Sequence, residues 1–156
     1  MSKKERCLIC ERIALIKEEL NPYFVTELKT SYVVIGDHQL FKGYTLILFK
    51  EHVAELHTLQ AQTKKIFLEE MSMVGEAVFN CFQPRKMNYE LLGNSENHLH
   101  WHLFPRHKDD SQSQKPVWCV DKVIRYADTC RPTFSERENM KQRLRAEIIK
   151  LRKDRM

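Results

Sequence analysis

The chain lacks long apolar runs and contains little glycine or proline. Only 4 glycines and 5 prolines occur among its 156 residues, a composition that is ordinary for a globular protein. No segment approaches the roughly eighteen consecutive apolar residues that a membrane-spanning helix needs, which excludes a membrane protein. Residues 1–6 carry charges but are not followed by the apolar core and cleavage site of a signal peptide. We therefore expect a cytoplasmic protein with no membrane partner.

Cysteine is sparse, and its number is odd. The 5 cysteines lie in a chain that carries no export signal. Such cysteines are typically thiols or metal ligands, because the cytosol keeps thiols reduced. A chain of 156 residues can also bury the core of one domain without disulfide support. We therefore expect one domain whose cysteines stay free or bind a metal.

The charge balance is basic. A formal net charge of +5 favours a polyanionic substrate. Much of the positive charge lies in residues 141–155, where acidic residues are interleaved with it, as is typical of a solvated helix face. Aromatic rings that can stack on bases are scarce there, since Phe134 is the only one after Tyr126. Nucleic acid is therefore not an expected partner.

Three segments have the apolar spacing of helices. Residues 7–20 carry isoleucines spaced by four and three, and Asn21-Pro22 ends this short helix. Residues 58–82 carry a longer apolar stripe that predicts one long helix, which Gln83-Pro84 ends. A last stripe runs to the C-terminus, and Ser135 to Glu138 fits a capping box at its start.

Five segments have the composition of strands. They cover residues 24–28, 32–35, 44–49, 87–92 and 97–104. The polar residues 108–115 predict a mobile loop. The expected fold is α+β: a five-stranded antiparallel sheet with one long helix between strands three and four, an N-terminal helix and a C-terminal helix. Residues 1–110 form the expected main domain, and residues 111–156 form a loop and helical extension that packs on the same domain or on a second subunit.

The run His98-Leu99-His100-Trp101-His102 lies in the last expected strand. Side chains of a strand point alternately to its two faces, so the three imidazoles share one face and the apolar residues share the other. Clustered imidazoles that titrate near neutral pH are suited to nucleophilic or acid–base chemistry, or to metal binding. The run alone does not separate these chemistries.

The run resembles the signature of the histidine triad family, in which three histidines alternate with apolar residues. The similarity extends over Lys42 to Leu48 and over Asn88 to Ser95, and covers about residues 7–107. The family implies a nucleotide-binding domain over residues 1–110, a five-stranded fold and a homodimer. It also implies cleavage at the α-phosphorus of dinucleoside polyphosphates or nucleoside phosphoramidates. A covalent intermediate divides this displacement into two easier steps.

The resemblance also implies the roles of single residues. His100 would be the nucleophile, with His98 and His102 beside it, and His102 would bind a phosphate oxygen. Ser95 and Asn94 occupy positions at which the family contacts the phosphate and the leaving group, although both also suit a turn. A similar contact is implied for Asn88. Asp37 lies near the position of the family's ribose-binding acid, and it equally suits a turn.

One residue departs from the family pattern. Many members have histidine where this chain has Tyr44, after the glycine of the third strand. Tyrosine keeps a hydroxyl that can form hydrogen bonds, so support for the triad can survive in a different form. The departure leaves room for a second interpretation, in which the protein binds adenosine nucleotides as a regulator without turnover.

Cys7 and Cys10 have the two-residue spacing that lets both sulfurs reach one zinc ion. In similar members of the family a histidine after the third strand and the first triad histidine complete the site, which implies His52 and His98 here. Such zinc would be structural, and the reaction would need no catalytic metal. The alternatives are two buried thiols, His57 as a substitute ligand, or a metal-dependent hydrolase in which the histidine row itself binds zinc.

Overall fold

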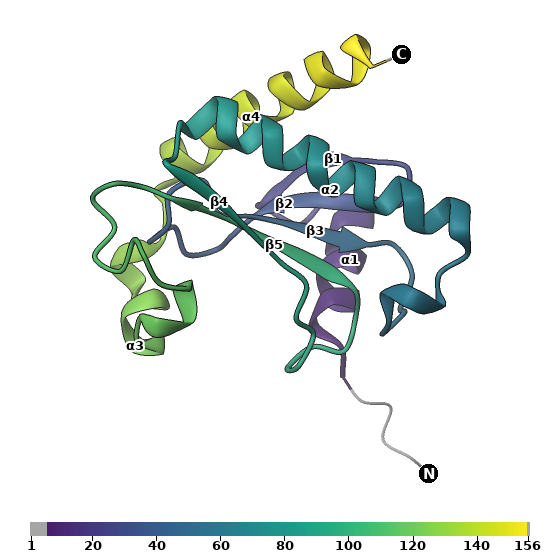
Figure 1. Ribbon diagram of the computed structural model, residues 1–156, viewed down its shortest axis with the longest axis horizontal. Helices are drawn as coiled ribbons and strands as arrows, with labels where there is room; N and C mark the ends of the chain where they lie inside the picture. The colour runs from purple at the N-terminus through teal and green to yellow at the C-terminus, as the bar shows by residue number, and fades with distance from the viewer. Residues whose placement is uncertain (1–5, 156) are drawn as a thin grey trace.

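One antiparallel sheet organises the computed structural model, which describes residues 6–155. Within these residues its strands are β1 (Phe24–Glu27), β2 (Ser31–Ile35), β3 (Thr45–Phe49), β4 (Lys86–Glu90) and β5 (His100–Arg106). Their order across the sheet is β1-β2-β3-β5-β4. The last strand is therefore inserted between β3 and β4, and β4 lies at an edge (Figure 1). The predicted α+β class and the five antiparallel strands are confirmed.

The helices also follow the predicted pattern. They are α1 (Leu8–Lys17), α2 (Ala61–Phe82), the short α3 (Lys122–Arg125) and α4 (Phe134–Asp154). Short 3-10 turns occupy Leu56–Thr58, Val117–Cys119 and Asp128–Cys130. The long helix α2 connects β3 to β4, as the sequence predicts. No helix among residues 6–155 is long and apolar enough to cross a membrane.

The start of α4 corrects one expectation. The cap is Thr133, whose hydroxyl accepts from the amide of Glu136 while the Glu136 carboxylate accepts from the Thr133 amide. Ser135 already lies inside the helix. Both Thr133 and Ser135 fit the capping-box pattern in the sequence, but Thr133 is preceded by Pro132 and has the extended backbone that a cap requires.

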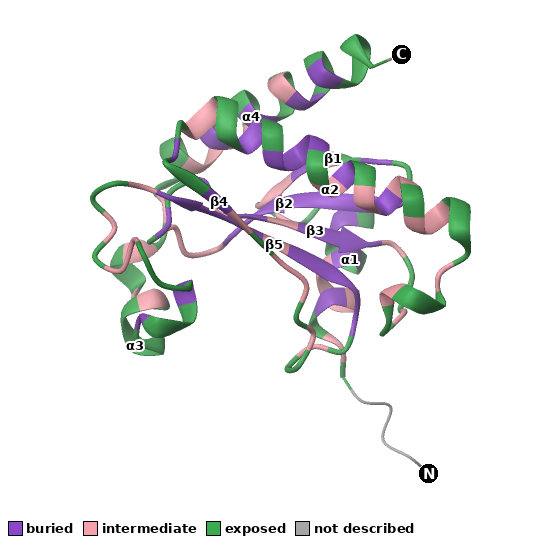
Figure 2. Ribbon diagram, viewed as in Figure 1, coloured by how far each residue is buried: buried purple, intermediate pink, exposed green. Residues whose placement is uncertain are grey.

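The main core lies between the sheet and the two long helices. Figure 1 shows α2 and α4 together on one side of the sheet and α1 on the other, and Figure 2 shows buried residues along both long helices. The sheet contributes Ile47, Trp101 and Leu103, all of them buried against residues of α2 and α4 such as Phe67 and Leu144. Because these residues alternate along β3 and β5, the remaining residues of both strands face the other way.

The opposite face is only partly covered by α1. Ile9 and Ile13 of α1 pack against Leu48 of β3. In the register of β3 and β5, Leu48 lies opposite His100 and Leu46 lies opposite His102. Cross-strand partners share a face, so these two histidines lie on the α1 side of the sheet, beside the helix.

The polar residues 108–115 form a loop, as the sequence predicts, and hydrogen bonds connect this loop to β5. The cause is Arg106, whose guanidinium is buried and donates to the carboxylate of Asp110 and to the carbonyls of Gln112 and Lys115. Arg85 donates to the carbonyl of Ser113 on the outer side. A buried guanidinium needs such acceptors, so the segment folds around it.

Candidate active site

His100 is buried on β5 with both of its nitrogens in defined contacts. Its Nδ1 lies 2.6 Å from the carbonyl oxygen of His98. A carbonyl can only accept, so Nδ1 of His100 carries the proton and donates. A neutral imidazole has one proton on its ring nitrogens, and the lone pair is therefore on Nε2. A single backbone carbonyl thus gives His100 the nucleophilic form.

His102 continues the same hydrogen-bond chain. Its Nε2 lies 3.1 Å from Nε2 of His100, and its Nδ1 lies 2.7 Å from the hydroxyl of Tyr44. Since Nε2 of His100 has a lone pair, Nε2 of His102 must be the donor, and the Tyr44 hydroxyl donates to Nδ1. Burial, together with the neighbouring imidazole of His100, lowers the pKa of His102 from 6.5 to about 3. His102 is therefore a neutral donor near pH 7.

The Tyr44 ring is held rigidly beside His102. It stacks on Phe104 with ring centroids 4.1 Å apart. A Cβ atom on Gly36 would come within 2.2 Å of Cδ1 of Tyr44, so glycine is the residue that leaves room for the ring. Burial raises the pKa of the Tyr44 hydroxyl above its ordinary value, which keeps the hydroxyl protonated as a donor. The departure from the family pattern therefore preserves a hydrogen bond to the triad.

His98 lies just before the regular strand, and its ring faces Cys7 and Cys10 at the start of α1. The sequence predicted a strand from residue 97, but β5 begins at His100. Leu99 forms backbone hydrogen bonds with both Phe49 and Val53, so the chain before His100 leaves the regular ladder. The ring of His98 is fully buried, and its Nε2 lies 2.8 Å from the carbonyl oxygen of Phe49. Because that carbonyl accepts, the lone pair of His98 is on Nδ1.

Nδ1 of His98 points into a group of four metal-binding side chains. Cys7, Cys10, His52 and His98 place their ligand atoms within 4.8 Å of one another. Nδ1 of His98 lies 3.5 Å from each sulfur, and Nδ1 of His52 lies 3.3 Å from the sulfur of Cys10. Tetrahedral zinc bound to sulfur and nitrogen requires ligand separations of about 3.5 Å. The donor set and its geometry therefore fit zinc, and the bond from His98 to Phe49 orients the ligand.

The structure does not bring the remaining predicted residues, as far as its described residues show, into one cluster with the histidines. Ser95 and Asn94 are exposed in the segment between β4 and β5. Asn88 lies on β4, where its side-chain oxygen accepts from Arg106 at 3.0 Å. Asp37 is held by both Nη atoms of Arg12, at 2.9 and 2.7 Å. His57 is exposed and lies outside the group of metal-binding side chains.

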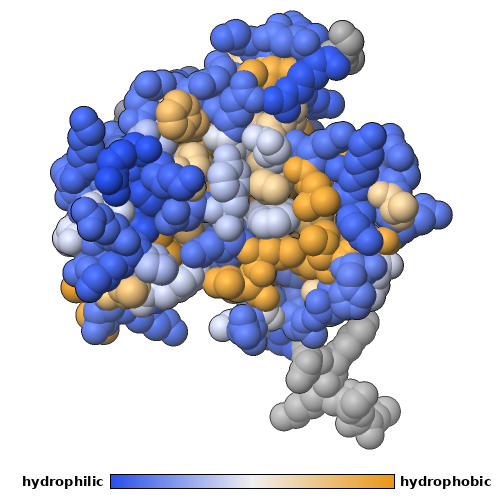
Figure 3. Space-filling model, in the orientation of Figure 1, coloured by the Kyte–Doolittle hydropathy of each residue, from blue (hydrophilic) through white to orange (hydrophobic). Residues whose placement is uncertain are grey.

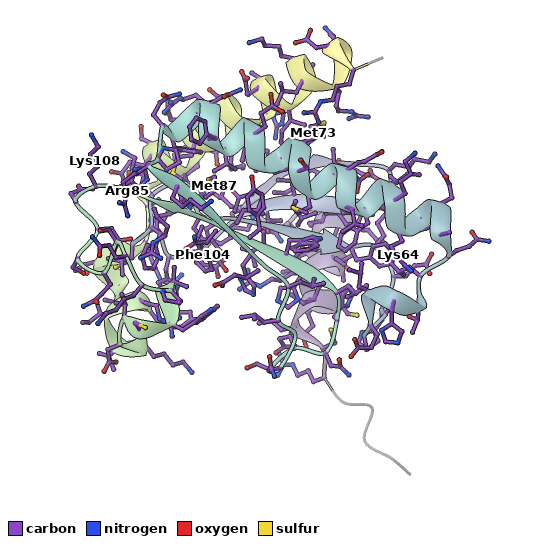
Figure 4. All side chains as sticks on the ribbon, in the orientation of Figure 1. Lys64, Met73, Arg85, Met87, Phe104 and Lys108 are labelled. Carbon is purple, nitrogen blue, oxygen red and sulfur yellow. The ribbon has the colours of Figure 1, made fainter. Side chains whose placement is uncertain are left out.

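One residue at the site was not expected from the sequence. The ring of Trp118 stands perpendicular to His102, with centroids 5.8 Å apart, and its Nε1 donates to Glu90 at 2.9 Å. Val117 and Val120 anchor the segment by packing on Phe104. Figure 4 labels Phe104 of β5 on the side of the strand that faces the segment containing α3. Alternation along a strand finds His102, but no pattern of that kind predicts which loop returns to it.

Comparison with known proteins identifies the class. The family model of the HIT domain matches residues 17–109, and the chain belongs to the HIT family. It is 25% identical over 108 residues to Protein hit of Bacillus subtilis, and the alignment covers 66% of this chain and 72% of that protein. It is 24% identical over 106 residues to adenosine 5'-monophosphoramidase HNT1 of Saccharomyces cerevisiae, and the alignment covers 67% of this chain and 65% of the yeast protein.

Solved structures share the fold. A histidine triad protein of Bradyrhizobium japonicum matches with a TM-score of 0.71 at 22% identity, covering 83% of this chain and 94% of that chain. A zinc-bound histidine triad family protein of Mycobacterium smegmatis matches with a TM-score of 0.66 at 17% identity, covering 95% and 96% of the two chains. The predicted family and fold are confirmed by these findings together with the family match.

Proposed function

We propose that the protein is a nucleotide hydrolase or transferase that cleaves at the α-phosphorus of dinucleoside polyphosphates or nucleoside phosphoramidates. The observation that carries this proposal is the contact of His100 Nδ1 with the carbonyl of His98, which leaves a lone pair on Nε2. A neutral donor, His102, lies beside that lone pair. The yeast relative is named as an adenosine 5'-monophosphoramidase, which supports the same class of reaction.

The first step forms a bond from Nε2 of His100 to the α-phosphorus. The bond from phosphorus to the leaving group breaks, its electron pair departs with that group, and the group takes up a proton from solvent. His102 gives up its contact with His100 and donates Nε2–H to a phosphate oxygen. The positive imidazolium of the nucleotidyl-His100 intermediate keeps its Nδ1 proton, which the carbonyl of His98 stabilises.

The second step returns the enzyme to its starting state. Water attacks the same phosphorus, loses a proton to solvent, and the bond from phosphorus to Nε2 breaks with its electron pair returning to His100. The product is a nucleoside monophosphate. Ser95 and Asn94 are proposed to contact the phosphate or the leaving group, and Asn88 to contact the transferred phosphate.

Asp37 is proposed to contact the ribose, in which case it shares its carboxylate with Arg12. The two oxygens of a carboxylate accept more than two hydrogen bonds, so the pairing with Arg12 leaves acceptor capacity for a ribose hydroxyl. In this proposal residues 1–110 carry the chemistry and residues 111–156 form the extension.

Cys7, Cys10, His52 and His98 would hold a structural zinc ion, which would tie α1 to the start of β5. The proposed ion stabilises the fold and orients His98, and no step of the reaction passes through it. The rival in which the three histidines bind a catalytic metal is not favoured. Nδ1 of His98 faces the two thiols, whereas Nδ1 of His100 is occupied by a backbone carbonyl.

We also propose a homodimer. The edge strand β4 has one open side, and Tyr89 on this strand and Phe79 on α2 expose large apolar side chains. Figure 3 shows apolar surface on this face of the molecule, bordered by hydrophilic helices. An open edge beside exposed apolar residues is suited to pairing with a second copy. Light scattering after size-exclusion chromatography measures the assembly, and a monomer at all concentrations would contradict it.

The decisive experiment is the substitution His100→Ala. Turnover of adenosine 5'-phosphoramidate should fall by roughly a thousandfold or more, because no other group can form the covalent intermediate. Rapid quenching of the wild-type protein, followed by mass spectrometry, should find a nucleotidyl group on His100. His57→Ala is the matched control, since this exposed histidine belongs to neither site, and it should keep full activity. A nucleotidyl group on another residue, or activity retained by His100→Ala, would refute the mechanism.

A further inference from the structure

The segment from Val117 to Tyr126 lies beside the triad but has no role in the two proposed steps. Val117 and Val120 are buried against Phe41 and Phe104, which fixes the segment on the triad side of the sheet. The amide of Gln39 donates to the carbonyl of Cys130 at 2.7 Å and ties down the chain just beyond it. The segment is therefore a fixed wall of the site.

Two rings of this wall hold one guanidinium. Arg125 lies 4.8 Å from the ring centroid of Trp118 and 5.4 Å from that of Tyr126. Its Nε donates to the carbonyl of Val120 at 2.9 Å. Since Trp118 itself contacts His102, these interactions place Arg125 one ring away from the triad. The two ring contacts restrict the motion of the Arg125 guanidinium, and this lowers the entropy cost of binding a ligand.

Arg125 differs from the other arginines near the site. Arg12 is paired with Asp37, and Arg106 is paired with Asp110. Among residues 6–155, no carboxylate lies within ion-pair distance of Arg125, and no protein acceptor is bonded to its Nη atoms. The nearby carboxylate of Glu90 instead accepts from Trp118. Arg125 therefore carries an uncompensated positive charge with two nitrogens free to donate.

We propose that Arg125 binds a phosphate group of the leaving group, beyond the phosphorus that His100 attacks. This inference rests on the proposed function and narrows its substrate class to nucleoside polyphosphates, including dinucleoside polyphosphates. A planar guanidinium matches two phosphate oxygens at once. The amine released from a phosphoramidate carries no such oxygens, so Arg125 discriminates between the two substrates. Trp118 and Tyr126 orient the guanidinium and add apolar surface for a second base.

The test compares two substrates in matched variants. In Arg125→Gln, kcat/KM for diadenosine tetraphosphate should fall about 10- to 100-fold, as expected for a lost charge-assisted hydrogen bond. The value for adenosine 5'-phosphoramidate should change less than about twofold on the same scale. Arg131→Gln is the control, because this arginine lies near the same segment but is paired with Asp128. It should leave both values unchanged.

Two other results for Arg125→Gln would overturn the proposed role of Arg125 in phosphate binding. An equal fall for both substrates would mean that Arg125 only supports the fold, and no fall would mean that it is merely solvated. Arg125→Lys keeps the charge but lacks the paired nitrogens, so it should recover only part of the activity on the tetraphosphate.

A binding measurement separates this proposal from the proposed function. Calorimetry on the His100→Ala protein should show tighter binding of ADP than of AMP, and the added substitution Arg125→Gln should remove that difference. If the wild-type protein turned over neither substrate, the proposed function would fail, and this difference would still decide the role of Arg125. An ADP preference that survives Arg125→Gln would refute the subsite.

Discussion

The two ends of the histidine run use the same side chain in opposite ways. At one end, His98 donates a hydrogen bond from Nε2–H to the carbonyl of Phe49 and presents a lone pair on Nδ1 to two thiols. At the other end, Nδ1 of His102 accepts a hydrogen bond from the Tyr44 hydroxyl, and its Nε2–H donates to His100. The difference shows that the partner of one ring nitrogen determines the chemistry of the other. A donor partner makes the imidazole a donor, and an acceptor partner makes it a ligand or a nucleophile.

The largest effect should come from breaking the metal-binding end. Cys7→Ser should lower zinc content and reduce the melting temperature by roughly 10 °C, as expected for a loss of a few kcal/mol in a domain of this size. Metal analysis and calorimetric melting measure the two effects. Cys119→Ser is the control, since this exposed cysteine lies outside the group. If zinc content stayed the same in Cys7→Ser, the proposed metal site would be wrong.

A smaller effect should come from removing the hydrogen bond between the Tyr44 hydroxyl and His102. Tyr44→Phe removes the donor to the buried Nδ1 of His102, so its proton is no longer confined to Nε2. We expect kcat to fall about tenfold, from the loss of one buried hydrogen bond, with little change in KM. Nitrogen NMR should show a mixture of His102 tautomers in this variant. Tyr44→His keeps a donor and should restore most of the activity.

A second substitution tests the same contact without removing any polar group. Gly36→Ala places a methyl group where the Tyr44 ring lies, and it should shift the His102 signals in the same direction. Unchanged signals in both variants would show that Tyr44 serves only as packing.

The last effect concerns the pH dependence of stability. The folded-state pKa of His102, about 3, lies below the ordinary value of 6.5, so the unfolded chain takes up this proton first. The contribution to stability is fully present above pH 6.5 and is lost as the pH falls from there toward 3. Denaturant unfolding of the wild type and of His102→Gln should show a steeper loss for the wild type across this range. Parallel curves would mean that His102 is not held in its neutral form.

Much of the fold was predictable because it depends on local periodicity. The alternation of Trp101 and Leu103 with the histidines identified β5 and its buried face, and the apolar stripe of α2 identified the long connection. The turn of His98 out of the strand was not predictable, since it depends on backbone hydrogen bonds of Leu99 with Phe49 and Val53. The contact of Trp118 with His102 was missed because it joins a short 3-10 turn, without periodicity, to a distant strand.

The carbonyl of His98 has a consequence for how the two ends can vary. Every amino acid has a main-chain oxygen, so replacing His98 can remove a metal ligand while the acceptor for His100 remains. The position of the proton on His100 is therefore set by the path of the chain and not by the identity of residue 98. A variant of this chain without Cys7, Cys10 and His98 should accordingly keep the same tautomer of His100, provided that the chain still enters β5 along the same path.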